Sequence, residues 1–286
     1  MSVIRTVARH LLPARLRSVL GHLLAAQGRT WRHRLEAGRR RRFGREVERL
    51  RTWCNSISWG DRLLTLDKSC GFRDDPAFAR ALVSIPRSDE FDGPDRIAWR
   101  LNTLCWAARR ALRSGGDFVE CGVYRGDMSW FLAQVIGADK IPHFYLYDSF
   151  SGFSPAYSSS SDFADSPGFL DFANEIYRTE GLYESVSNRF AGYTNFTVIK
   201  GFLPETLDQA CPQQIGYLNL DLNSVRAELA VLERLFDRVV AGGVIVFDDY
   251  GWWQYRNQRP ITDKFIAARG YEILELPTGQ GLLVKR

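Results

Sequence analysis

The sequence predicts an α/β fold built on a mostly parallel β-sheet. From about residue 61 to residue 286, short apolar runs alternate with helical stretches, as in a sheet whose strands are joined by helices. Glycine pairs at Gly115-Gly116 and Gly242-Gly243 mark turns before two of the apolar runs. The last two runs are joined only by residues 277–280, which predicts an antiparallel hairpin that closes the sheet.

A basic segment precedes this alternation. Residues 1–50 contain 13 Arg, no Lys, no Asp and three Glu, hence a charge of +10, and the remaining 25 basic and 30 acidic residues give −5. Apolar residues recur at three- and four-residue steps over residues 3–26, with arginines between them, as in an amphipathic basic helix. We expect residues 1–60 to form a basic helical arm. It has four interpretations: a membrane-surface helix, a nucleic-acid tail, a transit segment, or a helix packed on its own domain or a partner subunit.

The remainder is expected to form one domain over residues 61–286. Residues 61–115 form its helical cover, with an apolar-striped helix over residues 95–112, and residues 116–286 form its core. Core helices are expected over residues 128–136 and 226–236. Seven strands are expected, at Asp117–Cys121, His143–Asp148, Phe196–Lys200, Gly216–Asp221, Val244–Asp248, Tyr271–Leu276 and Gly281–Lys285.

The composition is that of a folded, soluble protein. The 45% of apolar residues and 25% of charged residues are average for globular proteins and exclude global disorder. No apolar run reaches the roughly 20 residues that a membrane span needs. The five cysteines are scattered without a CxxC pair, which argues against a zinc site and a disulfide framework. We therefore expect a reducing compartment, the cytoplasm.

Four of the first five core strands end in or beside an acidic residue. These residues are Glu120, Asp148, Asp221 and the pair Asp248-Asp249. In an open parallel sheet, ligands bind beyond the carboxyl ends of the strands, near the point where the strand order reverses. The sequence therefore predicts the functional site at this edge.

The turn after the first core strand indicates what this edge binds. It carries Gly122 and Gly126 but lacks both the GxGxxG pattern of a dinucleotide site and the lysine of a phosphate-binding P-loop. Glu120 can attract an ammonium group, and Asp148, 28 residues further on, can accept both hydroxyls of a ribose. S-adenosylmethionine contains these groups and no phosphate.

A second acidic group predicts a divalent cation. Asp221, Asp248 and Asp249 follow neighbouring strands, and carboxylates in such positions suit Mg²⁺. A purely structural alternative is that Asp249 caps the next helix and that Asp221 hydrogen-bonds a backbone turn.

Several motifs, in this order along the chain, resemble the macrocin O-methyltransferase family. The motifs are Phe118–Val123, Tyr147–Phe153, Asn219–Leu222, Gly242–Gly251 and Leu276–Gly281. This family comprises class I S-adenosylmethionine-dependent enzymes that methylate sugar hydroxyls, and its best-known members use Mg²⁺. The resemblance covers residues 61–286 and implies a Rossmann-like class I methyltransferase domain with a seven-stranded, mostly parallel sheet.

The resemblance also implies roles for individual residues. The cofactor would be held by Glu120, Gly122, Ser129, Asp148, Gly201 and Phe202. The metal would be held by Asp221, Asp248 and Asp249. The aromatic side chains of Tyr250, Trp252 and Trp253 would border the sugar, with ordinary core packing as the alternative.

Two departures from the family pattern affect the chemistry. Asn219 and Asn223 stand where the family usually has an acid and a tyrosine, which removes one negative charge from the metal site. Some relatives use a histidine as the base in the loop after the second strand, and residues 154–184 contain none. We therefore expect Asp221, or a loop acid such as Asp162 or Asp165, to deprotonate the sugar hydroxyl.

These observations predict an S-adenosylmethionine-dependent O-methyltransferase that acts, with Mg²⁺, on a sugar hydroxyl of a glycan or glycosylated metabolite. A NAD-type oxidoreductase, a nucleic-acid methyltransferase that uses the basic arm and a non-catalytic scaffold stay open. The missing third glycine argues against the first, and the acidic edge argues against the second. We expect a homo-oligomer that binds no nucleic acid and contacts the inner face of the membrane through residues 1–50.

Overall fold

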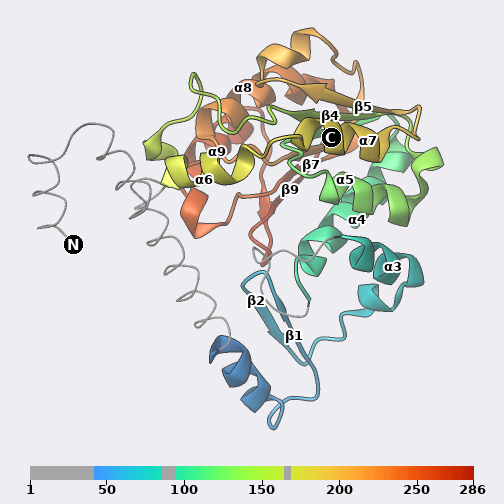
Figure 1. Ribbon diagram of the computed structural model, residues 1–286, viewed down its shortest axis with the longest axis vertical. Coiled ribbons are helices and arrows are strands. Elements are labelled where there is room, and N and C mark those ends of the chain that lie inside the picture. The colour runs from blue at the N-terminus through green and yellow to red at the C-terminus, as the bar shows by residue number, and fades with distance from the viewer. Residues whose placement is uncertain (1–41, 86–94, 164–168) are drawn as a thin grey trace, which may run out of the picture. The chain divides into compact units, whose positions relative to one another are not determined.

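The computed structural model describes residues 42–85, 95–163 and 169–286 (Figure 1). The chain divides into two compact units, one of residues 1–69 and 92–94 and one of residues 70–91 and 95–286. The predicted basic helix over residues 3–26, and the arm up to residue 41, lie outside the described residues.

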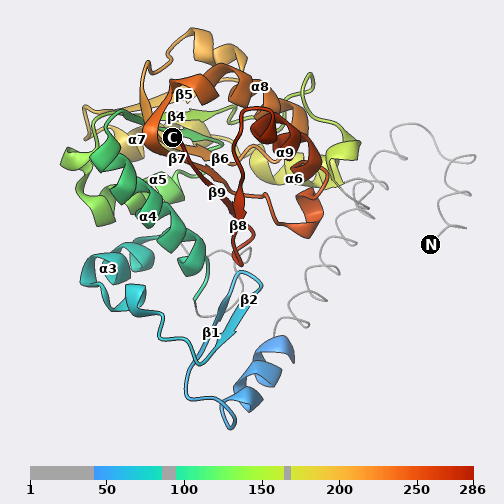
Figure 2. The same cartoon turned by 180° about the vertical axis from the view of Figure 1, so that it is seen from behind.

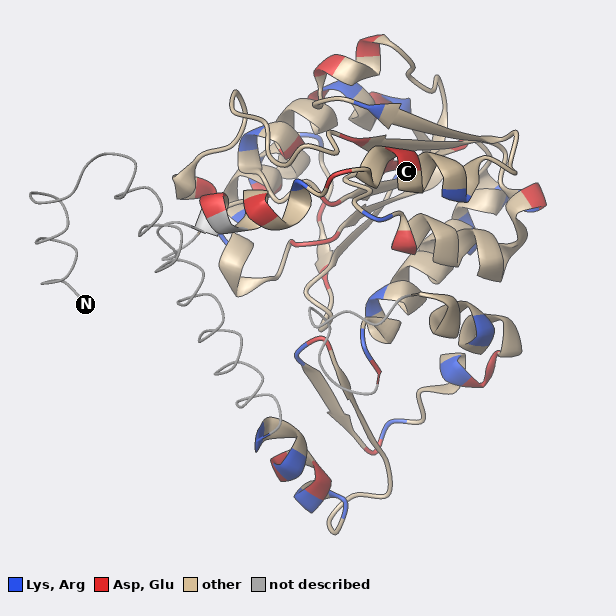
Figure 3. Cartoon of the chain, in the orientation of Figure 1, with Lys and Arg blue, Asp and Glu red and all other residues tan. Residues whose placement is uncertain are grey.

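The described part of the first unit is a short helix followed by a β-hairpin. Residues 42–50 are helical and carry side chains of both charges (Figure 3). β1 (Ile57–Gly60) pairs antiparallel with β2 (Leu63–Leu66), and both turn residues, Asp61 and Arg62, have positive φ as a two-residue hairpin turn requires. The sequence analysis expected helix both before and after residue 60, and this is wrong over β1 and β2. Strands of four residues are too short to show a clear alternation of apolar and polar residues.

A seven-stranded sheet forms the centre of the second unit. Its strand order is β5-β4-β3-β6-β7-β9-β8; β3 to β7 are parallel, and β9 runs antiparallel to both β7 and β8. The strand order reverses between β3 and β6. The bounds are β3 (Asp117–Cys121), β4 (Phe144–Asp148), β5 (Phe196–Lys200), β6 (Ile215–Leu220), β7 (Val239–Phe247), β8 (Leu274–Glu275) and β9 (Gly281–Val284). This architecture confirms the predicted sheet and its closing hairpin.

Helices cover both faces of this sheet (Figure 1, Figure 2). Phe118 and Tyr217 pack on one face with α3, α4, α5 and α7, whereas Val119 and Leu218 pack on the other face with α8 and α9. The bounds are α3 (Pro76–Ser84), α4 (Ala98–Ser114), α5 (Asp127–Leu132), α6 (Phe169–Tyr177), α7 (Leu182–Phe190), α8 (Val225–Leu235) and α9 (Arg259–Ala267). None of the helices in the described part of the chain has the length and apolarity of a membrane span.

Most predicted boundaries lie close to the observed ones. β3 to β6 begin and end within one residue of prediction, whereas β7 begins five residues early, at Val239, and continues through Gly242-Gly243. A register shift opposite Ile215 accommodates these extra residues. The helix predicted over residues 128–136 is α5 followed by a π-helical turn, Ala133–Gly137. Helices α6, α7 and α9 were not predicted, and α3 was expected only as part of the helical cover over residues 61–115.

Candidate active site

The predicted carboxylates converge at the carboxyl edge of the sheet. Glu120 is near the end of β3 and Asp148 ends β4, while Asp221 and Asp248 directly follow β6 and β7. Asp221, Asp248 and Asp148 all act electrostatically on Glu120. The parallel arrangement of four strands is what brings side chains so distant in sequence to one place.

Gly122 allows the turn after β3 to pass close to the segment after β6. Its φ is +94°, and a Cβ atom there would lie 1.8 Å from the backbone oxygen of Asp221. No other residue type fits this approach without moving backbone. The glycine therefore allows the turn after β3 and the segment after β6 to lie in close contact at the carboxyl edge.

The Asp148 carboxylate holds two loops through backbone donors. Its Oδ2 accepts from the amides of Val123 and Tyr124, both at 2.8 Å, and its Oδ1 accepts from the amide of Phe150 at 2.6 Å. Tyr124 and Phe150 have φ values of 47° and 50°, in the left-handed region that bulky residues rarely adopt. Burial raises the pKa of Asp148, and the three amides oppose this rise. The carboxylate thus stabilises two strained turns beside the predicted ribose position.

Glu120 and Asn219 form a buried pair at the switch point of the sheet. They are register partners across β3 and β6, and Asn219 Nδ2 donates to Glu120 Oε1 at 3.3 Å. Burial raises the pKa of Glu120 well above its usual value, and repulsion from Asp221 adds to the rise. The other carboxyl oxygen, Oε2, has no hydrogen-bond partner among the described residues. An orphaned buried oxygen is a fitting partner for the ammonium group of S-adenosylmethionine.

The other predicted cofactor residues lie around this pair. Ser129, near the start of α5, is fully buried, and its hydroxyl has no partner in the described part of the chain. Gly201 follows β5 with a φ of +147° and donates its amide hydrogen to the backbone oxygen of Asp148 at 2.9 Å. Phe202 is half-buried next to it. Their contact with a cofactor stays a prediction.

Asp221, Asp248 and Asp249 form the one group that can hold a metal ion among the described residues. One oxygen from each carboxylate lies within 4.8 Å of the others. Burial raises the pKa of Asp221 and Asp249 well above the usual range, and repulsion within the group raises both further. Oδ2 of Asp249 is buried and has no hydrogen-bond partner in the residues described. Three crowded carboxylates with an orphaned oxygen fit a hard divalent cation, which favours their ionised forms.

Arg100 is a charged residue of this site that the sequence analysis missed. It extends from α4, is only 9% exposed, and donates from Nη1 to Asp248 Oδ2. Gln280, in the turn before β9, donates to Asp248 Oδ1 at 2.8 Å. One feature of the sequence could have revealed Arg100: it is a charged residue inside the apolar stripe of a helix, between the buried Ala98 and Leu101.

Asp162, one of the two loop acids expected as the base, is hydrogen-bonded within its own loop. Asp162 is buried and accepts from the amide of Ser159 at 3.0 Å and, more weakly, from the hydroxyl of Ser224 at 3.4 Å. It caps a short 3-10 turn, and this capping role argues against Asp162 as the base. Asp165 lies outside the described residues.

The three aromatic residues after β7 have different surroundings. Tyr250 packs into the core, with its hydroxyl donating to Asp263 at 2.5 Å, so the core-packing alternative describes it better. Trp252 is half-buried, and the guanidinium carbon of Arg100 lies 5.6 Å from the centre of its ring. Trp253 is 74% exposed, with the Arg256 guanidinium carbon 3.9 Å from its ring. Of these three residues, Trp253 is thus the one whose aromatic ring is accessible to a ligand.

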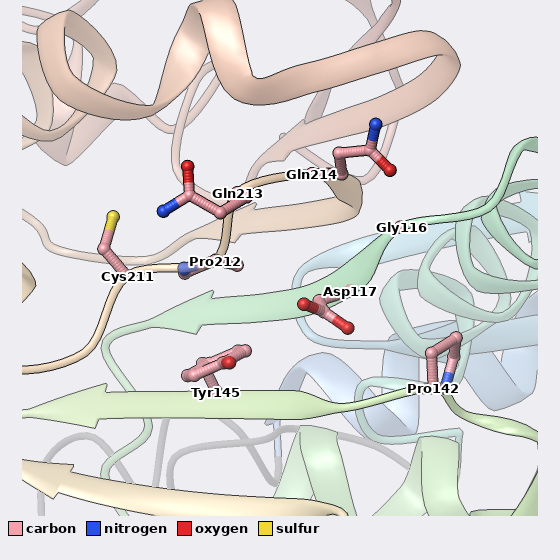
Figure 4. Close-up of a pocket in the computed structure, with 8 residues that line it drawn as sticks. All are labelled: Gly116, Asp117, Pro142, Tyr145, Cys211, Pro212, Gln213 and Gln214. Atoms are coloured by element: carbon pink, nitrogen blue, oxygen red, sulfur yellow. The ribbon is translucent and has the colours of Figure 1, made fainter.

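The opposite, amino edge of the sheet has a pocket of different character (Figure 4). Its volume is about 390 Å³, and it includes Asp117 at the start of β3, Tyr145 and Cys211. Asp117 is its sole acidic residue, accompanied by proline, glutamine and glycine. Among the described residues, the lining of this pocket therefore lacks the grouped carboxylates of the carboxyl edge.

A family comparison identifies the chemistry. The sequence profile of the macrocin-O-methyltransferase (TylF) family matches residues 98–273, more than half of the chain. The chain belongs to the macrocin O-methyltransferase family. It is therefore an S-adenosylmethionine-dependent methyltransferase, as the motifs predict.

Two curated relatives of this family member show the same chemistry. The mycinamicin III 3''-O-methyltransferase of Micromonospora griseorubida is 27% identical over 182 residues, which cover 58% of this chain and 71% of that protein. The 8-demethyl-8-(2,3-dimethoxy-alpha-L-rhamnosyl)-tetracenomycin-C 4'-O-methyltransferase of Streptomyces olivaceus is 27% identical over 186 residues, 62% of this chain and 65% of that protein. The chain thus spans less than two thirds of the second relative. Neither relative favours the oxidoreductase or nucleic-acid alternative.

Solved structures agree on the fold of this methyltransferase. The O-methyltransferase NovP is 20% identical with a TM-score of 0.53, and the match covers 65% of this chain and 79% of NovP. The calicheamicin methyltransferase CalS11 is 18% identical with a TM-score of 0.50, and the match covers 76% of this chain and 93% of CalS11. At these identities the likeness shows the Rossmann-like class I methyltransferase fold alone.

Proposed function

We propose that this methyltransferase transfers the methyl group of S-adenosylmethionine to a sugar hydroxyl of a glycosylated metabolite or glycan, with Mg²⁺ at its acidic cluster. Both curated relatives are named as O-methyltransferases, and the name of the second gives a rhamnosyl-bearing tetracenomycin as its substrate. The observation that carries the proposal is the convergence of Asp221, Asp248 and Asp249 within 4.8 Å beside the donor residues. Such a site would activate a hydroxyl acceptor, which is a poor nucleophile at neutral pH.

The half of the edge at β3 and β4 holds the methyl donor in this proposal. Asp148 accepts from the ribose hydroxyls, for which Oδ1 has a lone pair left besides its bond to Phe150. Oε2 of Glu120 and the hydroxyl of Ser129 supply buried polar groups without other partners among the described residues. Gly201 and Phe202 lie beside the adenine. Holding the donor in one orientation contributes to the rate because it removes the entropy cost of alignment.

The half at β6 and β7 activates the acceptor. Asp221, Asp248 and Asp249 would hold Mg²⁺, which, when bound, stabilises the negative charge that develops on the acceptor oxygen. Asp221 serves as the base: the O–H bond of the sugar breaks and its proton passes to a carboxylate oxygen. The acceptor oxygen forms a bond to the methyl carbon, and the carbon–sulfur electron pair stays on sulfur to give S-adenosylhomocysteine. Burial and the neighbouring Asp248 raise the pKa of Asp221, and a bound cation would lower it again, so that the carboxylate would be ionised and able to accept the proton.

Trp253 supports a sugar-binding role for the loop after β7. Its indole is largely exposed, and the stacked Arg256 side chain limits its movement. Exposed aromatic faces pack well against the apolar faces of sugar rings. We assign Trp252 and Trp253, rather than Tyr250, to the acceptor side of the site.

The test is methyl transfer from labelled S-adenosylmethionine to a panel of small-molecule glycosides, including rhamnosides, read by mass spectrometry. We expect a mass gain of one methyl group on the sugar, lost in EDTA and restored by Mg²⁺. Methylation of the aglycone, or of no glycoside at all, would contradict the sugar assignment. Full turnover in EDTA would contradict the role of the metal.

We further propose that residues 1–50 bring this enzyme to the inner face of the cytoplasmic membrane and that it assembles as a homo-oligomer. The support for the first point is the +10 charge of this segment together with its apolar periodicity. Binding of the full chain to anionic but not neutral vesicles, with loss on deletion of residues 1–41, tests it. Light scattering of the purified protein tests the second.

A further inference from the structure

A buried arginine that belongs to a helix, and not to a strand end, contacts the acidic cluster. Arg100 comes from α4, 148 residues before Asp248 in the sequence, and its Nη1 donates to Asp248 Oδ2. Asp248 is fully buried, and its second oxygen, Oδ1, accepts from Gln280 Nε2 at 2.8 Å. Both oxygens of this predicted metal ligand are therefore already hydrogen-bonded.

The positive charge of Arg100 offsets part of the repulsion within the cluster. The neighbouring carboxylates raise the pKa of Asp221 and of Asp249. The positive charge of Arg100 acts on both residues and lowers these pKa values. Guanidinium and a divalent cation favour the same carboxylate oxygens but repel each other. Full occupation of the cluster by both is therefore unfavourable.

Trp252 provides a second contact for the arginine. Its ring centre lies 5.6 Å from the Arg100 guanidinium carbon, and its amide donates to the backbone oxygen of Asp249 at 3.1 Å. A guanidinium stacked on an indole can lose one carboxylate bond and still retain a favourable partner. The arginine can thus move away from Asp248 without becoming a solitary buried charge.

We propose that Arg100 is the resident counter-ion of the acidic cluster and that a divalent cation binds by displacing its guanidinium from Asp248. This inference rests on the metal site of the proposed function. Arg100 is then a positioning residue that limits metal affinity and holds Asp248 in place before the metal enters. Gln280 holds the other oxygen of Asp248 throughout the exchange.

The experiment measures Mn²⁺ binding to the full chain without donor or acceptor, by electron paramagnetic resonance and calorimetry. Arg100→Met removes the competing charge, and we expect it to bind Mn²⁺ about tenfold more tightly than the wild type, or more. Arg100→Lys keeps a charge with a shorter reach and should fall between them. Arg113→Met, at an exposed position of the same helix, is the matched control and should leave the affinity unchanged.

The melting temperature provides a second readout, because Arg100→Met leaves Asp248 without its cation. We expect Mn²⁺ to raise the melting temperature of Arg100→Met more than that of the wild type or Arg113→Met. If the wild type binds Mn²⁺ and Arg100→Met binds it equally or more weakly, this inference is wrong and the metal site stands. If neither protein binds Mn²⁺, the metal site and this inference both fall, whereas methylation of a glycoside is tested separately.

Discussion

The two halves of the carboxyl edge hold their carboxylates in different ways. At β4, Asp148 accepts from three backbone amides and is fixed by neutral donors. At β6 and β7, three carboxylates lie within 4.8 Å of one another, and the cation of Arg100 contacts one of them. Backbone amides hold a carboxylate in place. A crowded group of like charges, by contrast, is stabilised when a cation is added.

In the proposed function, this difference gives each half its own task. A fixed acceptor such as Asp148 suits the neutral hydroxyls of a ribose, which need geometry more than charge. The crowded cluster suits the activation of an acceptor, where negative charge develops during the reaction. The two tasks meet at Gly122, whose turn touches the backbone of Asp221.

The largest expected effect separates the two halves. Asp221→Ala should lower turnover by about a thousandfold or more, because it removes both the base and a metal ligand. Binding of S-adenosylhomocysteine, measured by calorimetry, should stay close to wild type. Asp237→Ala, at an exposed position, is the control and should be fully active. If the Asp221 variant had wild-type turnover in EDTA, this result would contradict the role proposed for the metal.

Gly122→Ala should break the junction between the halves. The added Cβ would lie 1.8 Å from a backbone oxygen at a φ of +94°, so we expect a loss of about 3–4 kcal/mol in unfolding free energy. Chemical denaturation measures it. Gly192→Ala is the matched control, because no atom lies within 4 Å of its new Cβ, and it should change stability by less than about 1 kcal/mol. Equal stability of the two variants would contradict the close approach.

Glu228 sharpens the comparison, since it adds a buried carboxyl that acts electrostatically on Asp221 and Asp249. Burial raises its pKa from 4.5 to about 7, and Thr262 donates to its Oε1 at 3.1 Å. Between these two values the folded state binds more protons than the unfolded state, so stability falls as the pH rises, and the cost is complete above about pH 7.

Glu228→Gln keeps the acceptor for Thr262 and removes this titration. The variant should match the wild type near pH 4.5 and exceed its unfolding free energy by about 3 kcal/mol at pH 8. Denaturant titrations across this pH range provide the measurement. Glu233→Gln, exposed on the same helix, should follow the wild type at every pH. A Glu228 variant that loses the same stability with pH as the wild type would show that its carboxyl is not the titrating group.

Asp148→Asn should produce the smallest effect, and only in the donor half. One carboxylate oxygen becomes an amide nitrogen that cannot accept from the backbone, so we expect about tenfold weaker binding of S-adenosylhomocysteine. Mn²⁺ affinity should stay unchanged, which serves as the internal control. A loss of Mn²⁺ affinity equal to the loss of donor affinity would show that the two halves are not separate.

The sequence predicted the parts of the site that lie on strands. An apolar run followed by an acid marks a strand end, and parallel pairing then places Asp148, Asp221 and Asp248 at one edge. Arg100 escaped prediction because its partner lies 148 residues away and a helical arginine usually faces solvent. The capping role of Asp162 also depends on a loop conformation that apolar periodicity does not encode.

A crystal structure with S-adenosylhomocysteine and Mn²⁺ tests the central claim most directly. The account predicts the ribose beside Asp148 and an anomalous Mn²⁺ peak among Asp221, Asp248 and Asp249, with the Arg100 guanidinium withdrawn from Asp248. S-adenosylhomocysteine bound at the amino-edge pocket of Asp117 and Tyr145, or Mn²⁺ bound away from these three carboxylates, would contradict it.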